Sequence, residues 1–332
     1  MNRSPSRPTR LLLEGRAEAL KHHLPKAIEG DGIGVHHARV ASRRLRELVP
    51  VLAEDVKGNK ARKAERKIRR LTRALGAVRE LDVTLTVLDE LAARDTLPRN
   101  ALEDVRAHVV AEREERRSTM LKRMEKVSVE KLDRRLASMA QALDEAQAEE
   151  WRKALGTRLQ TRGKALLESI REAGQMYNPE RLHQVRIATK KLRYGLEIAS
   201  ESGVKTATPL VRQLKKVQDS LGRLHDLQVL QEHVAAVQTR PPTAQVPEGG
   251  LDAVSRLLED ECRHLHGRYL AMAPTLRTAV ESARQVVAEL IRPAGRTRRS
   301  ALAATARPRR AVGTVAGTTE TTAAPVAARG RR

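Results

Sequence analysis

An eleven-residue stretch that occurs twice is the feature that most constrains the fold of this chain. The first copy, HHARVASRRLR, covers residues 36–46, and the second, HQVRIATKKLR, covers residues 183–193. Five positions are identical and four more are conservative exchanges. On an α-helix, positions 36, 39, 43 and 46 fall within about 80° of one another, and apolar residues occupy the opposite face. The chain therefore contains two amphipathic helices, each with a basic stripe.

The basic stripes indicate a site for an anion. Their residues are His36, Arg39, Arg43 and Arg46 in the first copy, and His183, Arg186, Lys190 and Arg193 in the second. Like charges three or four residues apart on a helix repel each other. A chain that carries this unfavourable arrangement twice is expected to bind a negatively charged partner there.

The repetition extends beyond the basic helices. LGAVRELDV at 75–83 corresponds to LGRLHDLQV at 221–229. Upstream of these segments, the cations of the first copy match cations of the second: Arg66, Arg69 and Arg70 correspond to Arg212, Lys215 and Lys216. A period of about 147 residues predicts a duplicated half-domain and not a solenoid. We expect two four-helix bundles that are related by an approximate two-fold axis.

The composition predicts an all-α fold. Leu, Ala, Glu, Arg and Lys favour helix, and few segments alternate apolar and polar residues as strands do. Apolar periodicity, Pro and Gly predict helices over about 9–24, 35–54, 60–94, 98–127, 129–148, 149–176, 180–201, 208–238, 251–272 and 274–291. In this prediction Pro25 ends the first helix, and Pro274 separates the last two.

The same pattern divides the chain into regions. Residues 1–8 read as a flexible basic leader, and residues 9–291 as the folded domain. Its first repeat covers about 9–148 and its second about 149–291, with a Pro/Gly linker at 239–250. Residues 292–332 lack hydrophobic periodicity, so we expect a disordered, Arg-rich tail.

The charge of the chain favours anionic partners. The 332 residues carry a formal net charge of +23, and the last 41 contribute ten Arg and one Glu. Such a field attracts nucleic acid, anionic membranes or polyphosphate. Cys262 is the only cysteine, so neither a disulfide framework nor a Cys-based metal site is expected. No apolar run reaches 18 residues, and the sequence predicts a cytoplasmic protein without a cofactor.

Together, the paired blocks resemble the CHAD domain family (conserved histidine α-helical domain). The motifs are H-x-x-R-[VI]-x-x-[RK]-[RK]-L-R and L-G-x-[VL]-[RH]-[DE], each present in both halves and in the same order. The resemblance covers about residues 9–291 and includes no accompanying CYTH enzyme domain. It implies two helical bundles around a basic central channel that binds inorganic polyphosphate without catalysis. By position it implies these contacts: His36, Arg39, Arg43, Arg46, Arg70, His183, Arg186, Lys190, Arg193, Lys215 and Lys216.

The chemistry of these side chains suits polyphosphate independently of the resemblance. Polyphosphate has about one negative charge per unit and no base to be read. A row of cations can follow it, because Arg places two donors on one phosphate and Lys supplies a point charge. Protonated His could donate from both ring nitrogens. Binding of this kind would serve granule association or regulation linked to polyphosphate.

Other functions remain open at this point. A general polyanion or nucleic-acid-binding protein has the charge it needs, and the tail could contact nucleic acid non-specifically. However, one Trp, three Tyr and no Phe supply little base stacking. A helical metal-dependent phosphohydrolase is a second alternative, with His183, His225 and Asp226 joined by Asp252 or Asp260. Membrane binding is disfavoured because the basic helices use their apolar faces in the core.

Overall fold

All regular structure in the described part of the chain is helical, which confirms the predicted fold class. The computed structural model describes residues 8–56, 59–94, 96–125, 128–145, 149–240 and 249–292. Its helices are α1 (Pro8–Glu29), α2 (Gly32–Leu52), the short 3-10 helix η1 (Ala53–Asp55), α3 (Lys60–Ala92), α4 (Arg99–Glu125), α5 (Val129–Glu145), α6 (Glu150–Ala173), α7 (Pro179–Glu201), α8 (Ala207–Gln238) and α9 (Gly250–Ile291).

Side-chain caps define where the two basic helices begin. Asp31 precedes α2 and accepts hydrogen bonds from the backbone N–H groups of Ile33 (3.3 Å) and Gly34 (2.8 Å). Asn178 precedes α7 and accepts from the N–H of Arg181 at 3.0 Å. These bonds satisfy N–H groups that have no partner inside a helix. Both basic stripes therefore start from a fixed backbone position.

Two predicted helix boundaries are wrong, and both lie at proline. Pro25 is inside α1, which continues to Glu29, and Pro274 is inside α9, which runs unbroken from Gly250 to Ile291. A proline removes one backbone hydrogen bond. Buried side chains lie before and after each proline, such as Leu24 and Ala27 in α1, so both parts of the helix pack on the core. Tertiary packing therefore outweighs the local preference.

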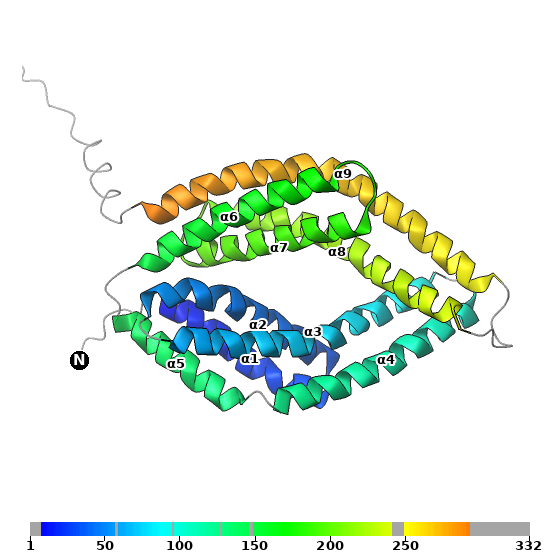
Figure 1. The fold of residues 1–332 in the computed structure, drawn as a ribbon, viewed down its shortest axis with the longest axis horizontal. Coiled ribbons are helices and arrows are strands. Elements are labelled where there is room, and N and C mark those ends of the chain that lie inside the picture. Colours follow the sequence, from blue (N-terminus) through cyan, green and yellow to red (C-terminus); the bar gives the residue numbers. More distant parts are fainter. Residues whose placement is uncertain are drawn as a thin grey trace, which may run out of the picture. The chain divides into compact units, whose positions relative to one another are not determined.

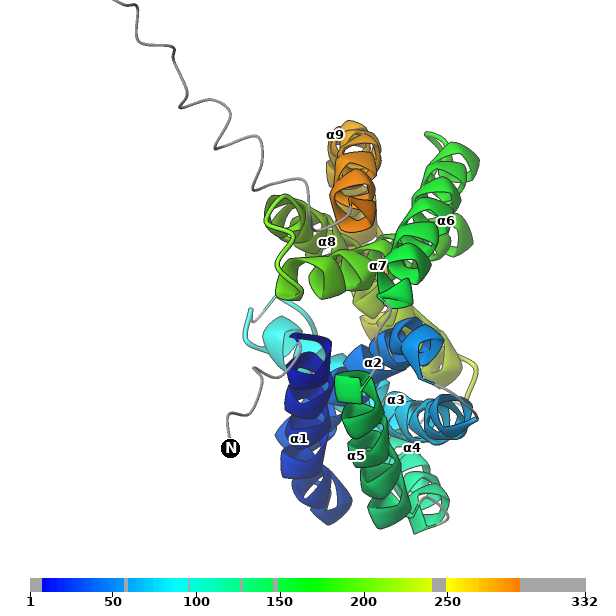
Figure 2. The ribbon, with the colours of Figure 1, turned by 90° about the vertical axis from the view of Figure 1, so that its left-hand side faces the viewer.

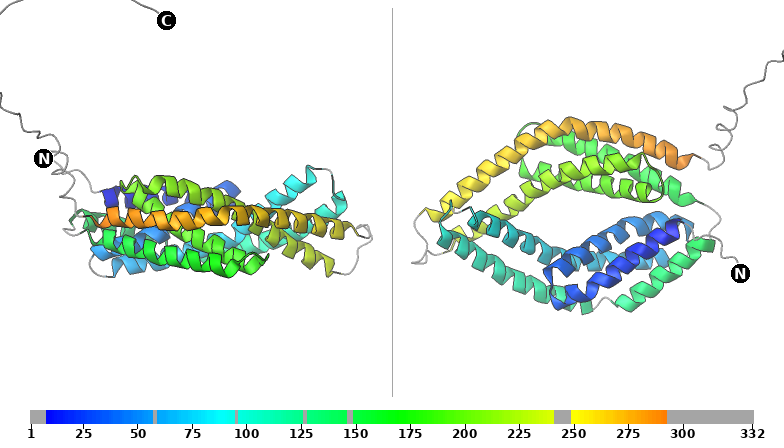
Figure 3. Two further views of the ribbon diagram at one scale, coloured as in Figure 1. Left: turned by 90° about the horizontal axis from the view of Figure 1, so that it is seen from above. Right: turned by 180° about the vertical axis from the view of Figure 1, so that it is seen from behind.

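The helices form two groups that follow the two halves of the sequence. Helices α1 to α5 pack side by side, and α6 to α9 make a second group, as Figures 1 and 3 show. The second group has four helices, whereas the first has five. The difference arises because α9 is continuous where the first half changes from α4 to α5. Ser128 caps α5 by accepting from the N–H of Lys131 at 3.2 Å.

The two groups meet in two places. Near the middle, α2 packs against α6 and α7, and Figure 2 shows α2 opposite them. Further along, α3 and α4 pack against α8, and α4 also packs against α9. Buried Arg16 of α1 also joins the groups, because it forms an ion pair with Glu201 of α7 at 2.8 Å. Within its own group, it donates a hydrogen bond to the backbone O of Arg44 at 3.0 Å. The buried Leu, Val and Ala side chains form one continuous cluster.

Some sequence predictions fall outside these residues. Residues 1–7 of the predicted leader, 241–248 of the predicted linker and 293–332 of the predicted tail are not among those described. The internal duplication and the central channel also remain predictions. Among the described residues, no helix is long and apolar enough to cross a membrane.

The two caps give a test of this fold. Replacing Asp31 or Asn178 with Ala should lower the free energy of unfolding by about 1 kcal/mol, because backbone N–H groups lose their acceptor. Chemical denaturation measures this change. The control is Asp260→Ala, which removes an exposed ion pair with Arg263 (3.0 Å) and should cost less than about 0.5 kcal/mol. Cap variants no less stable than the control would contradict the assignment.

Candidate anion-binding site

Four cations from the two sequence copies lie together between α2 and α7. Arg39 and Arg43 come from α2, and Arg186 and Lys190 from α7. All four are half-buried. Burial lowers the pKa of each, and the positive charges of neighbouring basic side chains lower it further. The i, i+4 spacing in each helix turns both pairs to the same side, and the packing of α2 on α7 brings the pairs together.

These four cations, here called the cation cluster, lack carboxylate partners. Among the described residues, no ion pair or side-chain hydrogen bond joins any of them to an acid. Glu80 and Asp226 are near enough to favour the charged form of Arg186, but neither forms an ion pair with it. The Nε atoms of Arg39 and Arg186 are buried without a hydrogen-bond partner. Buried donors of this kind are normally satisfied, so the cluster has unused capacity for an anion.

Lys190 is the member most affected by its surroundings. Burial and the charges of Arg43, Arg186, Arg39 and Arg193 lower the pKa of its ammonium group from 10.5 to about 6. At neutral pH the free protein therefore holds this side chain largely uncharged. The guanidinium of Arg39 keeps its charge, because burial lowers its pKa only to about 10. A bound anion would favour the protonated form of Lys190.

The outer cations of the two stripes are held by acids. Arg46 lies 3.6 Å from Glu47, and Glu47 is also paired with Arg162 of α6. Arg193 is paired with Glu197 and donates to Oε1 of Gln218 at 2.8 Å. These acids neutralise the ends of each stripe and leave its middle positive.

Tyr194 separates cations of the two helices. Its ring is buried, and the guanidiniums of Arg43 and Arg193 lie 5.3 and 4.6 Å from the ring centroid. The negative face of an aromatic ring attracts such cations. Tyr194 thereby supports two arginines without neutralising either of them.

A pocket of about 580 Å³ opens on the cation cluster. The cluster supplies part of its wall, and further residues of α2, α3 and α6 supply the rest. The lining includes Arg39, Arg43, Arg46, Glu47, Glu65, Arg69, Arg73, Gly76, Arg158, Arg162 and Lys190. A Cβ atom on Gly76 would lie 3.7 Å from the guanidinium of Arg39. That is an ordinary van der Waals distance, so the position of Arg39 does not require a glycine at residue 76.

The histidines of the two stripes are placed differently from the arginines. Nδ1 of His183 lies 3.3 Å from Nδ1 of His225 on α8. Burial and neighbouring cations lower the pKa of His183, and they lower the pKa of His225 to about 3. Burial and Arg79 likewise lower the pKa of His36. The three imidazoles are therefore neutral at pH 7, and the contact of His225 with Glu80 (3.9 Å) is not an ion pair.

Three predicted site residues lie apart from this cluster. Arg70 on α3 and Lys215 and Lys216 on α8 are exposed, and none of them lines the pocket. Lys215 forms an ion pair with Asp219 at 2.9 Å. The pocket is lined instead by two other arginines of α3, Arg69 and Arg73.

Two arginines of α6 were not among the predicted site residues. Arg158 and Arg162 line the pocket, and Arg162 donates to the backbone O of Lys191 at 2.8 Å. They lie outside both copies of the repeated motif, so the repeat gives no signal for them. Their i, i+4 spacing on an amphipathic helix is the only local indication.

The residues of the phosphohydrolase alternative are only partly brought together. His183 and His225 are neighbours, and burial raises the pKa of Asp226. The proposed acids lie elsewhere: Asp252 accepts from Gln238 at 2.9 Å, and Asp260 pairs with Arg263.

The fold and the cation cluster define an all-α protein with buried positive charge between two helices. A family model of the CHAD domain matches residues 11–235, more than half of the chain. The chain belongs to the CHAD domain family.

Comparison with solved structures gives further matches. The crystal structure of the CHAD domain from the plant Ricinus communis has a TM-score of 0.52 and 22% sequence identity, and the match covers 84% of this chain and 90% of that chain. PptA from Streptomyces chartreusis has a TM-score of 0.49 and 16% identity, with 85% and 97% covered. A comparison with curated proteins finds no match. The plant structure confirms the all-α fold.

The surroundings of Lys190 predict how stability responds to its removal. Between the folded pKa of about 6 and the ordinary value of 10.5, the unfolded chain binds more protons, so the contribution of Lys190 to stability rises with pH. Lys190→Met should therefore raise the free energy of unfolding at pH 7 by at least about 1 kcal/mol.

Chemical denaturation of both proteins across pH 7 to 10 measures this effect. The advantage of the variant should shrink as the pH rises. The control is Lys153→Met, at an exposed lysine on α6, and it should change stability little at either pH. An advantage of Lys190→Met that does not depend on pH would contradict the assignment.

Proposed function

We propose that this protein binds inorganic polyphosphate through the cation cluster and the adjoining pocket. The observation that carries the proposal is the half-buried group of Arg39, Arg43, Arg186 and Lys190, none of which is paired with an acid among the described residues. The CHAD family is associated with polyphosphate binding, and this chain has the two basic helices expected of a member.

Polyphosphate suits the pocket chemically. Each phosphate unit is a compact anion with oxygen acceptors. Arg39, Arg43 and Lys190 line the pocket and can donate charge-assisted hydrogen bonds to these oxygens. Arg186, whose Nε also has no hydrogen-bond partner, lies in the cation cluster but outside the pocket lining. Residues 36–46 span about 15 Å of helix, so one basic stripe can follow several phosphates. The pocket and the two stripes would be part of the predicted channel.

Nucleic acid fits the same surface less well. Single strands are held largely by bases stacked on aromatic rings. Of the aromatic residues, Trp151, Tyr194 and Tyr269 are buried, and only Tyr177 is exposed. The pocket thus offers charge without stacking platforms, which favours a polyanion that has no bases.

Catalysis is not part of the proposal. Among the described residues, His183, His225 and Asp226 do not belong to a group of three that could hold a metal ion. The charge of nearby Arg186 would repel a divalent cation. The protein would act by binding alone, in the cytoplasm or at polyphosphate granules, and without a cofactor.

A competition experiment at physiological salt tests the proposed function. Labelled long-chain polyphosphate bound to the full chain is displaced with unlabelled polyphosphate, DNA or RNA. Polyphosphate should compete best, and its affinity should fall steeply with salt because binding releases counterions. Equal competition by DNA would favour a general polyanion binder. Metal-dependent release of phosphate that is lost in His225→Ala would favour the phosphohydrolase.

Substitution of the cation cluster should weaken this binding. Arg39→Ala and Arg186→Ala each remove a buried guanidinium, and each should weaken polyphosphate binding at least about tenfold, since charge-assisted hydrogen bonds contribute about 1.5–3 kcal/mol. Circular dichroism should show unchanged helix content. The matched control is Arg268→Ala, at an exposed position on α9, and it should bind nearly as well as the wild type. Equal losses in all three variants would indicate a diffuse charge effect.

A further inference from the structure

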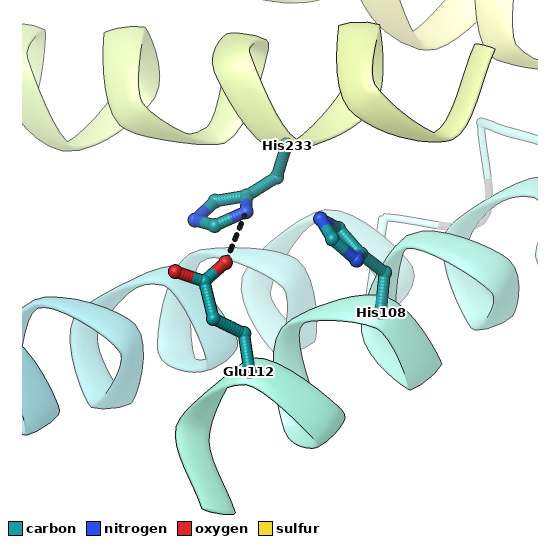
Figure 4. A group of neighbouring side chains, drawn as sticks. All are labelled: His108, Glu112 and His233. Atoms are coloured by element: carbon teal, nitrogen blue, oxygen red, sulfur yellow. Dashed lines mark ion pairs between the residues drawn. The ribbon is translucent and has the colours of Figure 1, made fainter. Parts of the chain in front are cut away.

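Three potential metal ligands meet where α4 packs against α8, at a second place away from the cation cluster. His108 and Glu112 are on α4, and His233 is on α8. One ligand atom from each lies within 4.8 Å of the others. Figure 4 shows the three side chains pointing toward one another across the two helices. In the described part of the chain, no other group of three His, Cys, Asp or Glu residues has this geometry.

We propose that His108, Glu112 and His233 bind a divalent transition-metal ion of the Zn²⁺ type, which links α4 to α8. Two imidazoles and one carboxylate are a ligand set that zinc takes in proteins, with water in the fourth position. Mg²⁺ and Ca²⁺ prefer oxygen ligands, so two imidazoles favour the transition metal. This site is independent of the proposed polyphosphate binding.

The positions of the ligands suit such a site. His108 and Glu112 are four residues apart, which places them on one face of α4. Nδ1 of His233 lies 3.7 Å from Oε2 of Glu112. Metal–ligand bonds of about 2.0–2.2 Å place tetrahedral ligands about 3.3–3.6 Å apart. The three side chains therefore need only small rotations to enclose an ion.

Neighbouring side chains orient Glu112 and shift the pKa of His108. Arg116 donates to Oε1 of Glu112 at 2.8 Å and leaves Oε2 to face His233. A hydrogen bond of this kind to a ligating carboxylate orients it for the metal. Burial and the charges of Arg240 and His233 lower the pKa of His108.

One contact opposes metal binding. Nη2 of Arg240, an exposed residue just after α8, donates to Nδ1 of His108 at 2.5 Å. A neutral imidazole has one lone pair and one N–H. An ion at Nδ1 would displace Arg240 directly. An ion at Nε2 would move the proton to Nδ1, which could then no longer accept. Arg240 therefore competes with the metal in either case.

The metal would brace the two helical groups. Helix α4 belongs to the first group and α8 to the second, and they meet where α4 also packs on α9 (Figure 1). The ligands on α4 and α8 are more than 100 residues apart in the chain. The three ligands come together only where the folded chain docks α4 on α8, so an ion that binds this state alone raises its stability.

Zinc titration of the full chain tests the proposal. After treatment with a chelator and removal of polyphosphate, Zn²⁺ is titrated in competition with a chromophoric chelator. The wild type should bind an ion that excess Mg²⁺ does not displace. His108→Ala and His233→Ala should each weaken this binding at least about tenfold. The control His264→Ala, at an exposed histidine of α9, should bind as the wild type does.

Two further variants guard against a folding artefact. Glu112→Gln keeps the shape of the side chain and should also weaken zinc binding. Arg240→Ala should strengthen it, because the competing cation is gone, and a variant that is merely misfolded would not do so. Zinc should raise the Tm of the wild type but not that of His233→Ala.

Two results of the zinc titration would contradict the proposed metal site. Zinc binding of equal strength in the wild type, His108→Ala and His233→Ala would overturn the proposal, and so would a wild type without saturable binding. His233→Ala should still bind polyphosphate. A loss of zinc binding there with polyphosphate binding intact separates this site from the cation cluster.

Discussion

The crowding of half-buried basic side chains between α2 and α7 is the constraint on which the rest of the structure depends. Arg39, Arg43, Arg186 and Lys190 lie together between α2 and α7, and no carboxylate is paired with any of them among the described residues. Burial, and after it the charges of the neighbouring arginines, lower the pKa of Lys190 to about 6. A charged, partly buried group without a partner is unfavourable, so the surrounding packing must hold α2 and α7 in place.

Several contacts around the cation cluster oppose this repulsion without neutralising it. Glu47 and Glu197 pair with the outer cations of each stripe, and Tyr194 lies beneath the guanidiniums of Arg43 and Arg193. The apolar faces of α2 and α7 are buried in the common core. The electrostatic repulsion is therefore greatest in the middle of each stripe, and a bound anion there would reduce it.

Local sequence patterns predicted much of the fold, and their failures have a common cause. Periodicity, Gly, Asn and Ser placed most helix ends within a few residues, because caps act over short distances. The helix ends predicted at Pro25 and Pro274 are wrong. Residues on both sides of each proline are buried, so α1 and α9 continue through it. The contact expected of Arg70 stays a prediction. Arg69 and Arg73 line the pocket, because the rotation of α3 about its axis decides which of its side chains face that side.

The sequence by itself determined the helical class, the two capped basic helices and the family, because each depends on local spacing or on a motif. Only the tertiary structure decided which cations meet, that Arg158 and Arg162 join them, and that His108 and Glu112 face His233. These groupings depend on how helices distant in the chain dock. Docking is set by the summed packing of many side chains, and no single segment of the sequence contains that information.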